Sequence, residues 1–225
     1  MVKVLNYIDP DALICILDHL MSHKLAVNRY RQKVGEGRSQ CFGIVRKRCL
    51  APDLSRQSWL DPYLHFRLME FGRVYVPVPF TSIQVNDSFI CGKHRDKNNE
   101  GESYIIGFGD YEGGELVVSE NGIETEYDIK YHPLLFNGSM LEHWTKPFTG
   151  RRFTIVYHTT VAPSRFPTLV TLEDYEAVRI QETGHWLIKW TKSDGSIEYL
   201  GGKKGLPHPL RGYKRLNDKK KSKII

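Results

Sequence analysis

A histidine and an aspartate two residues apart, His94 and Asp96, lie at the edge of a glycine-studded apolar stretch, GKHRDKNNEGESYIIGFGDYEGGELVV (residues 92–118). In a β-strand, residues i and i+2 point to the same face, so the pair can present an imidazole nitrogen and a carboxylate oxygen to one point. A non-haem Fe(II) centre uses these ligands with a second histidine and keeps positions open for co-substrate and oxygen. The spacing therefore indicates part of a metal site, and the alternative is a surface turn that contains a histidine.

The missing ligand is expected on a later strand of the same sheet structure. His143, in NGSMLEHWTKPFTGRRFTIVYHTT, lies where such a strand would return. Just beyond it, Arg152 could bind a distal carboxylate with paired hydrogen bonds. Strand alternation alone does not decide whether Arg151 or Arg152 faces inward.

The elements that must position these side chains are predicted to be mainly β-strands. From Val74 onward, six or seven short β-rich runs follow one another without intervening helices, which is typical of an antiparallel sandwich or barrel. Two helices are expected before them, beginning at Asp9-Pro10 and Asp61-Pro62. We expect Gly72 to end the second helix, and the first to bury one stripe: Leu13, Ile14, Leu17, Leu20 and Met21.

Length and composition indicate one well-cored domain with a small appendage. The chain has 225 residues, of which 40% are hydrophobic and 12% aromatic, as in folded proteins. Apolar runs fall short of the roughly 18 to 20 residues that span a bilayer, and no signal peptide is recognisable, so we expect a soluble, intracellular protein. The four cysteines form no Cys-x-x-Cys pair of a zinc or redox motif.

Positive charge is concentrated near the C-terminus. From Glu182 to Ile225 there are eleven Lys and Arg but four Asp and Glu, within a chain of net charge +6. A hairpin around Asp194-Gly195 is predicted there, followed by a basic tail. With its aromatic residues, the segment could contact phosphates and stack on bases; the alternative is a solvated tail that aids solubility. These aromatic residues are Trp186, Trp190 and Tyr199.

The ordered set of His-x-Asp, His143 and Gly-x-Arg resembles the double-stranded β-helix of Fe(II)/2-oxoglutarate dioxygenases. Within that superfamily, the wording from about Phe80 to Thr160 is similar to the TET/JBP family, which oxidises the methyl group of 5-methylcytosine or thymine in DNA. The resemblance implies that Arg152 anchors 2-oxoglutarate and that the protein uses Fe(II), 2-oxoglutarate and O2. It also implies a catalytic iron triad of His94, Asp96 and His143.

Substrate contacts are inferred from the same resemblance. Asn99 matches the place where relatives carry a polar residue that touches the flipped base, although the surrounding loop also favours turn chemistry. His158 shares strand parity with Arg152 and should face the interior with it. Relatives tend to place a base-contacting histidine where this chain has Thr160, and this departure leaves the preferred base open.

The sequence thus predicts an α+β, mainly β protein: a double-stranded β-helix (jelly-roll, cupin-like) with N-terminal helices and a C-terminal hairpin plus basic tail. The expected dioxygenase domain spans residues 1–180 (helical support 1–73, β-helix core 74–162), and residues 181–225 form the extension. We expect a monomer that oxidises 5-methylcytosine in DNA to 5-hydroxymethylcytosine, nuclear in a eukaryote, without membrane partners. The alternatives are a thymine hydroxylase of the JBP type, a protein or small-molecule hydroxylase, and a metal-free nucleic-acid-binding β-barrel.

Overall fold

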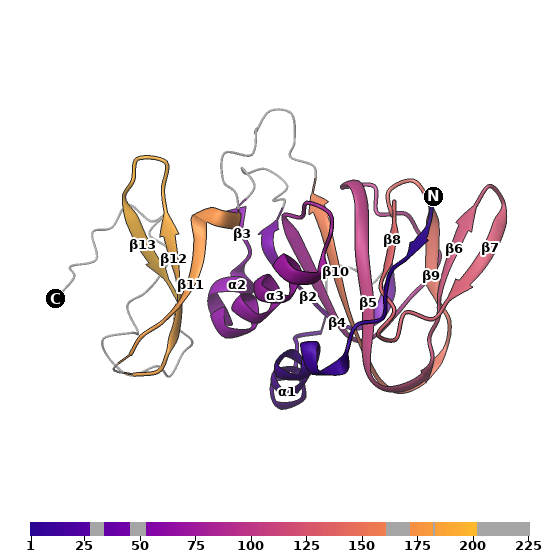
Figure 1. Cartoon of the computed structure of the whole chain (residues 1–225), viewed down its shortest axis with the longest axis horizontal. Helices are drawn as coiled ribbons and strands as arrows, with labels where there is room; N and C mark the ends of the chain where they lie inside the picture. The colour runs from indigo at the N-terminus through magenta and orange to yellow at the C-terminus, as the bar shows by residue number, and fades with distance from the viewer. Residues whose placement is uncertain (28–33, 46–52, 161–171, 182, 202–225) are drawn as a thin grey trace.

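The computed structural model describes residues 1–27, 34–45, 53–160, 172–181 and 183–201 (Figure 1). The described helices are η1 (Pro10–Leu13), α1 (Ile14–Ser22), α2 (Arg56–Leu60), α3 (Pro62–Tyr75) and η2 (Leu172–Asp174). The strands are β1 (Lys3–Val4), β2 (Gly35–Val45), β3 (Asp53–Leu54), β4 (Ser82–Cys91), β5 (Asn99–Gly113), β6 (Leu116–Glu120), β7 (Ile123–Tyr127), β8 (Leu134–Phe136), β9 (Glu142–Thr145), β10 (Phe148–Thr160), β11 (Tyr175–Arg179), β12 (Trp186–Thr191) and β13 (Ile197–Leu200). Among the described helices, none has the length and apolarity needed to cross a bilayer.

Two antiparallel sheets form the jelly roll. The major sheet has seven strands in the order β1-β8-β5-β10-β4-β2-β3, and the minor sheet has the order β7-β6-β9. Side chains of both sheets line one cavity, among them Thr154 and Val156 from β10 and Leu116 and Thr145 from the minor sheet. The predicted mainly β, jelly-roll architecture is therefore confirmed.

Strand alternation divides the central strand β10 between two environments. Phe153, Ile155 and Tyr157 are buried in the core cluster that also contains residues of α1 and α3. The Tyr157 hydroxyl donates to the Leu68 carbonyl of α3 at 2.7 Å, which attaches the helix to the sheet. The intervening residues line the cavity instead: Arg152, Thr154, Val156, His158 and Thr160. One strand thus carries both the structural core and the cavity wall.

The first helix begins as expected but buries a different stripe. The Asp9 side chain caps the first turn by accepting from the Asp11 amide at 2.9 Å. The buried residues are Leu13, Ile16 and Leu20, whereas Ile14 and Met21 are exposed. Apolar residues occupy nearly every position from Ala12 to Leu17, so the sequence pattern could not define which face of the helix is buried.

The prediction that Gly72 ends the second helix is wrong. α3 begins at Pro62 as expected but runs through Gly72 to Tyr75. A Cβ at Gly72 would lie 2.6 Å from Cζ of Phe80 and 2.8 Å from Cε1 of Tyr157. The glycine therefore permits close helix–sheet packing, and the helix ends before Val76-Pro77, where the helical conformation is disfavoured.

The strand β2 lies before Val74, outside the part of the chain in which the sequence predicts strands. It pairs with β4 from Gly35↔Cys91 to Gly43↔Ser82. Consecutive residues from Phe42 to Ile44 are buried, which removes the alternation that identifies a half-exposed strand. β4 continues through Ser88, which has a positive φ of 51°.

The C-terminal hairpin is present and belongs to a three-stranded sheet, β11-β12-β13. β11 lies before residue 180 and pairs with β12 after it, so the expected domain limit falls between paired strands. Trp186 packs against Phe66 of α3 with ring centroids 4.8 Å apart, and Trp190 stacks on Tyr175 at 5.7 Å. Two of the three aromatic residues expected on a base-stacking surface are therefore used in internal packing.

The described lysines of this sheet also have internal partners. Lys189 Nζ is 3.1 Å from Glu176 Oε2, and Lys192 pairs with Glu198. The cations of the expected basic tail that follow residue 201 lie outside the described residues. The proposed DNA contact of the tail thus remains a prediction.

Candidate metal centre

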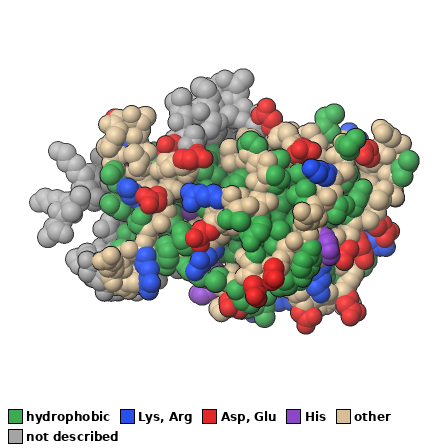
Figure 2. Space-filling model, in the orientation of Figure 1, with side chains coloured by type: hydrophobic (Ala, Val, Ile, Leu, Met, Phe, Trp, Pro, Cys, Tyr) green, Lys and Arg blue, Asp and Glu red, His purple; other side chains and the backbone are tan. Residues whose placement is uncertain are grey.

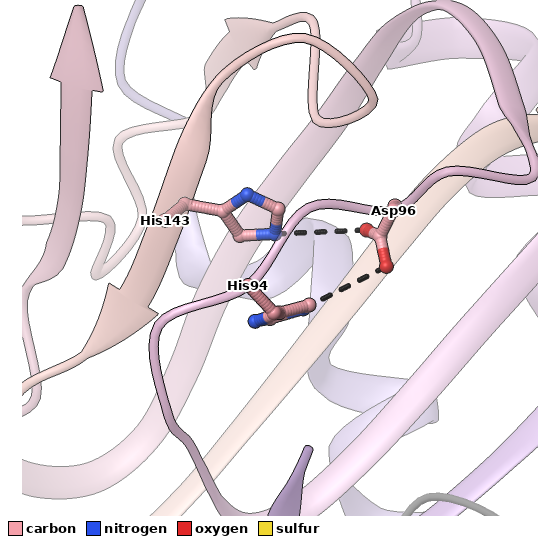
Figure 3. Close-up of side chains that lie close together, drawn as sticks. All are labelled: His94, Asp96 and His143. Atoms are coloured by element: carbon pink, nitrogen blue, oxygen red, sulfur yellow. Dashed lines mark ion pairs between the residues drawn. The ribbon is translucent and has the colours of Figure 1, made fainter. Parts of the chain in front are cut away.

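The structure brings His94, Asp96 and His143 together (Figure 3). Their ligand atoms all lie within 4.8 Å of one another. Nε2 of His94 is 3.6 Å from Oδ1 of Asp96, and Nε2 of His143 is 3.6 Å from Oδ2 of the same carboxylate. Two imidazoles and one carboxylate facing a common point are the donor set of a non-haem Fe(II) site with open positions.

The backbone holds the triad by joining the β4–β5 loop to the minor sheet. The His94 amide donates to the His143 carbonyl at 3.1 Å, and the His143 amide donates to the His94 carbonyl at 3.0 Å. The Asp96 amide donates to the Gly138 carbonyl at 2.8 Å. His94 and Asp96 therefore follow the end of β4 and converge through a loop, not through a continuous strand as expected.

Both imidazoles are oriented by hydrogen bonds from their second ring nitrogen. Nδ1 of His94 is 2.7 Å from the Gly92 carbonyl oxygen, and Nδ1 of His143 is 3.0 Å from the Leu141 carbonyl oxygen. A carbonyl only accepts, so Nδ1 carries the proton in each pair and the Nε2 lone pair faces Asp96. This is the tautomer and orientation of a histidine that binds a metal through Nε2.

Arg152 lies in the same cavity of about 890 Å³ as the triad. Its side chain is almost fully buried, and its Nε and Nη2 atoms donate to no acceptor within the described ranges. Burial lowers the pKa of Arg152, an effect that nearby Tyr111 opposes, but a guanidinium stays protonated in proteins. A Cβ at Gly114 would lie 2.9 Å from Nε of Arg152, so the glycine makes room for this side chain. A buried cation with unused donors is suited to a carboxylate ligand.

Arg151 points to the opposite face of β10. Its Nη2 is 3.0 Å from Oδ2 of Asp87, and the same nitrogen donates to the Leu20 carbonyl of α1 at 3.3 Å. Asp87 is buried, so the pair joins the helix layer to the major sheet. The choice between the two arginines, which alternation alone left open, is thus made by the strand's register.

Sequence reasoning missed a chain of polar side chains on the cavity wall beside Arg152. The Gln84 amide donates to Ser39 Oγ at 2.6 Å, and Ser39 Oγ donates to Asn86 Oδ1 at 2.6 Å. Asn86 Nδ2 then donates to Thr154 Oγ1 at 2.9 Å. Because Thr154 accepts in this chain, its own hydroxyl proton is available to donate to a ligand next to Arg152. The signal that could have identified Thr154 is its i+2 spacing from Arg152.

The two predicted substrate residues also reach this cavity. Asn99 and His158 both line it, together with Thr160. Asn99 is paired with Thr160 across β5 and β10, and its amide donates to the Asp96 carbonyl at 2.9 Å. The structure thus places the predicted iron, co-substrate and base contacts around one space, whereas contact with a base remains a prediction.

Neither a protein-family model nor a curated protein sequence matches this chain. Among solved structures, a Pseudomonas putida prolyl-4-hydroxylase is similar with TM-score 0.47 and 12% identity, covering 71% of this chain and 92% of that one. A 2OG-Fe(II) oxygenase family oxidoreductase from Burkholderia pseudomallei has TM-score 0.46 and 20% identity, with 70% and 82% covered. NgTET1 in complex with 5mC DNA has TM-score 0.48 and 13% identity, with 71% and 72% covered. Likeness at this level does not by itself assign a family to the chain.

Proposed function

We propose that this protein is an Fe(II)/2-oxoglutarate-dependent dioxygenase. The observation that carries the proposal is the shared cavity, in which the His94–Asp96–His143 cluster lies together with buried Arg152, whose Nε and Nη2 donors are unused. Burying a cation whose donors are unused destabilises the fold unless a ligand binds there. A barrel without a metal or an anionic ligand would gain nothing from this cost, so the arrangement favours the enzyme over a metal-free binding barrel.

The donor set fits iron, and the cavity fits its co-substrate. When bound, Fe(II) with 2-oxoglutarate and O2 would supply the oxidant that hydroxylates a C–H bond. His94, Asp96 and His143 would hold the metal on one side and leave the cavity side open. Arg152 and the Thr154 hydroxyl would bind the distal carboxylate of 2-oxoglutarate by charge-assisted and neutral hydrogen bonds. Apolar side chains of the wall would exclude water from this region: Ile105, Leu116, Phe136 and Val156.

The substrate we propose is 5-methylcytosine in DNA. The proposal is supported by the resemblance of the Phe80–Thr160 stretch to the TET/JBP family and by the location of Asn99 and His158 in the cavity wall. An amide and an imidazole can each hydrogen-bond the edge of a pyrimidine. Because the cavity lies between two sheets, a base in a duplex would have to leave the stack to reach it.

Asn99→Ala and His158→Ala should each lower 5-hydroxymethylcytosine formation by about tenfold or more, since each removes hydrogen bonds to a desolvated base. Both variants should still convert 2-oxoglutarate to succinate without DNA. Mass spectrometry of nucleosides after incubation with methylated DNA, Fe(II) and 2-oxoglutarate measures the product. His132→Ala provides the control, because this exposed histidine lies away from the cavity lining.

The same assay separates the alternatives. If the product is hydroxymethylated thymine, the substrate is thymine, as in the JBP type of enzyme, and not 5-methylcytosine. An enzyme that forms succinate with a peptide or metabolite but leaves all DNA bases unchanged would contradict the DNA assignment while leaving the iron site intact. No succinate under any condition would contradict the dioxygenase assignment itself.

A further inference from the structure

Two cationic side chains line the mouth of the cavity on the loop that carries the iron ligands. Arg95 and Lys97 alternate with His94 and Asp96 and contribute to the cavity lining. The Lys97 amide donates to the Arg95 carbonyl at 3.1 Å, and the Asn99 amide donates to the Asp96 carbonyl at 2.9 Å, so the loop is a tight turn. The Arg95 side chain is 49% exposed, and Lys97 is exposed as well.

The charges of this pair are poorly compensated by the protein. The carboxylate paired with Arg95, that of Glu142, is 4.0 Å away, and Lys97 makes no ion pair in the described part of the chain. Neighbouring Lys93, by contrast, has its Nζ 3.0 Å from Glu124 Oε1. Among the described residues that line the cavity, Asp96 is the sole acidic side chain, and it belongs to the triad.

Other described cations are interspersed with acidic side chains or paired with them. Over the face drawn in Figure 2, acidic and basic side chains are interspersed. In the C-terminal sheet, Lys189 and Lys192 are paired with glutamates. Arg95 and Lys97 lie beside the triad along the loop, and their charges remain available to a ligand.

We propose that Arg95 and Lys97 bind the phosphodiester groups that flank the base held in the cavity. This inference rests on the proposed function and names how the same site recognises a polynucleotide. A flipped base inside the cavity leaves its two flanking phosphates at the mouth, where the turn presents a planar guanidinium and a mobile ammonium. Iron ligand, proposed base contact and phosphate contacts then come from one stretch, residues 94–99, so the turn fixes the distance between the oxidising centre and the backbone.

The test compares a fluorescent single-stranded oligonucleotide containing one 5-methylcytosine with the same oligonucleotide whose two flanking linkages are neutral methylphosphonates. Binding is measured by anisotropy with Mn(II) in place of Fe(II). We expect the neutral linkages to weaken binding to the unaltered protein by about tenfold, since each lost phosphate contact removes one exposed ion pair of modest strength. The Arg95→Ala/Lys97→Ala double variant should bind both oligonucleotides equally. For the unmodified oligonucleotide, the slope of the logarithm of its binding constant against the logarithm of the salt concentration should be shallower by roughly one and a half units than for the unaltered protein.

Two further variants make the result specific. Arg95→Lys/Lys97→Arg keeps both charges and should retain the discrimination, which a merely structural role of these side chains would not predict. Lys146→Ala removes a lysine that pairs with Glu126 away from the cavity lining and should also retain it. Equal binding of both oligonucleotides by the unaltered protein, no binding of either, or discrimination that survives in the double variant would each overturn the proposal.

Failure of this inference is distinguishable from failure of the proposed function. Discrimination that depends on the pair, without any oxidised base, would leave phosphate binding in place and contradict the base assignment. Formation of 5-hydroxymethylcytosine without discrimination would leave the enzyme assignment in place and contradict the role of Arg95 and Lys97.

Discussion

Asp96→Ala should reduce substrate oxidation and succinate formation to background and strongly weaken Fe(II) or Mn(II) binding. The substitution removes the only carboxylate among the three ligand atoms, and both imidazole Nε2 atoms lie 3.6 Å from its oxygens. Two neutral imidazoles alone do not complete the facial set of two histidines and one carboxylate. Calorimetric titration with Mn(II) and an assay of succinate measure the two effects independently.

The matched control is Asp110→Ala, because Asp110 is an exposed aspartate of β5 that does not line the cavity. It should bind Mn(II) and turn over 2-oxoglutarate as the unaltered protein does. His94→Ala and His143→Ala should reproduce the loss seen with Asp96→Ala. Full activity of Asp96→Ala would show that the triad is not the metal site.

Arg152→Ala should raise the apparent KM for 2-oxoglutarate by about 10- to 150-fold, because a charge-assisted hydrogen-bonded pair in a closed site contributes about 1.5–3 kcal/mol. The loss should fall mainly on co-substrate binding, since Arg152 is not a metal ligand. Steady-state kinetics with 2-oxoglutarate as the varied substrate measure it, and Mn(II) titration confirms that the metal site persists.

Arg151→Ala is the matched control on the adjacent position. Arg151 pairs with buried Asp87 on the face toward the helices, so its loss should lower the melting temperature and leave KM for 2-oxoglutarate unchanged. A larger rise in KM for Arg151→Ala than for Arg152→Ala would contradict the register of β10 in this structure.

The grouping of His94, Asp96 and His143 with Arg152 around one cavity could be predicted from the sequence, because the residue types are distinctive and their order along the chain is constrained. Two imidazoles and one carboxylate are the donor set of a non-haem Fe(II) site, and Gly-x-Arg follows them in the sequence. Which of the adjacent arginines faces the cavity was harder to predict, since strand alternation assigns them to opposite faces without saying which face is inside. The pairing of β10 with β4 and β5 provides that answer.

The contacts that support the site could not be predicted, because they join residues remote in sequence. Thr154 is oriented through Asn86 and Ser39, and these three residues belong to three different strands. Glycine often follows the last residue of a helix, so Gly72 was expected to end α3. Its role instead depends on Phe80 and Tyr157, which pack closely against the helix at this position. Local propensity gives no information on such encounters, which tertiary packing decides.

The position of the C-terminal sheet has a consequence for how the chain unfolds. Ile188 and Leu200 are fully buried in the core cluster that includes Leu64 and Leu68 of α3, and Tyr157 connects that helix to β10. Elements that share one apolar core lose it together, so the jelly roll and this sheet should behave as one cooperative unit in calorimetry, with a single transition. A fragment that ends at residue 180 would expose the apolar surface of α3 and would be prone to aggregate. The sheet is thus best regarded as part of the same folding unit as the jelly roll.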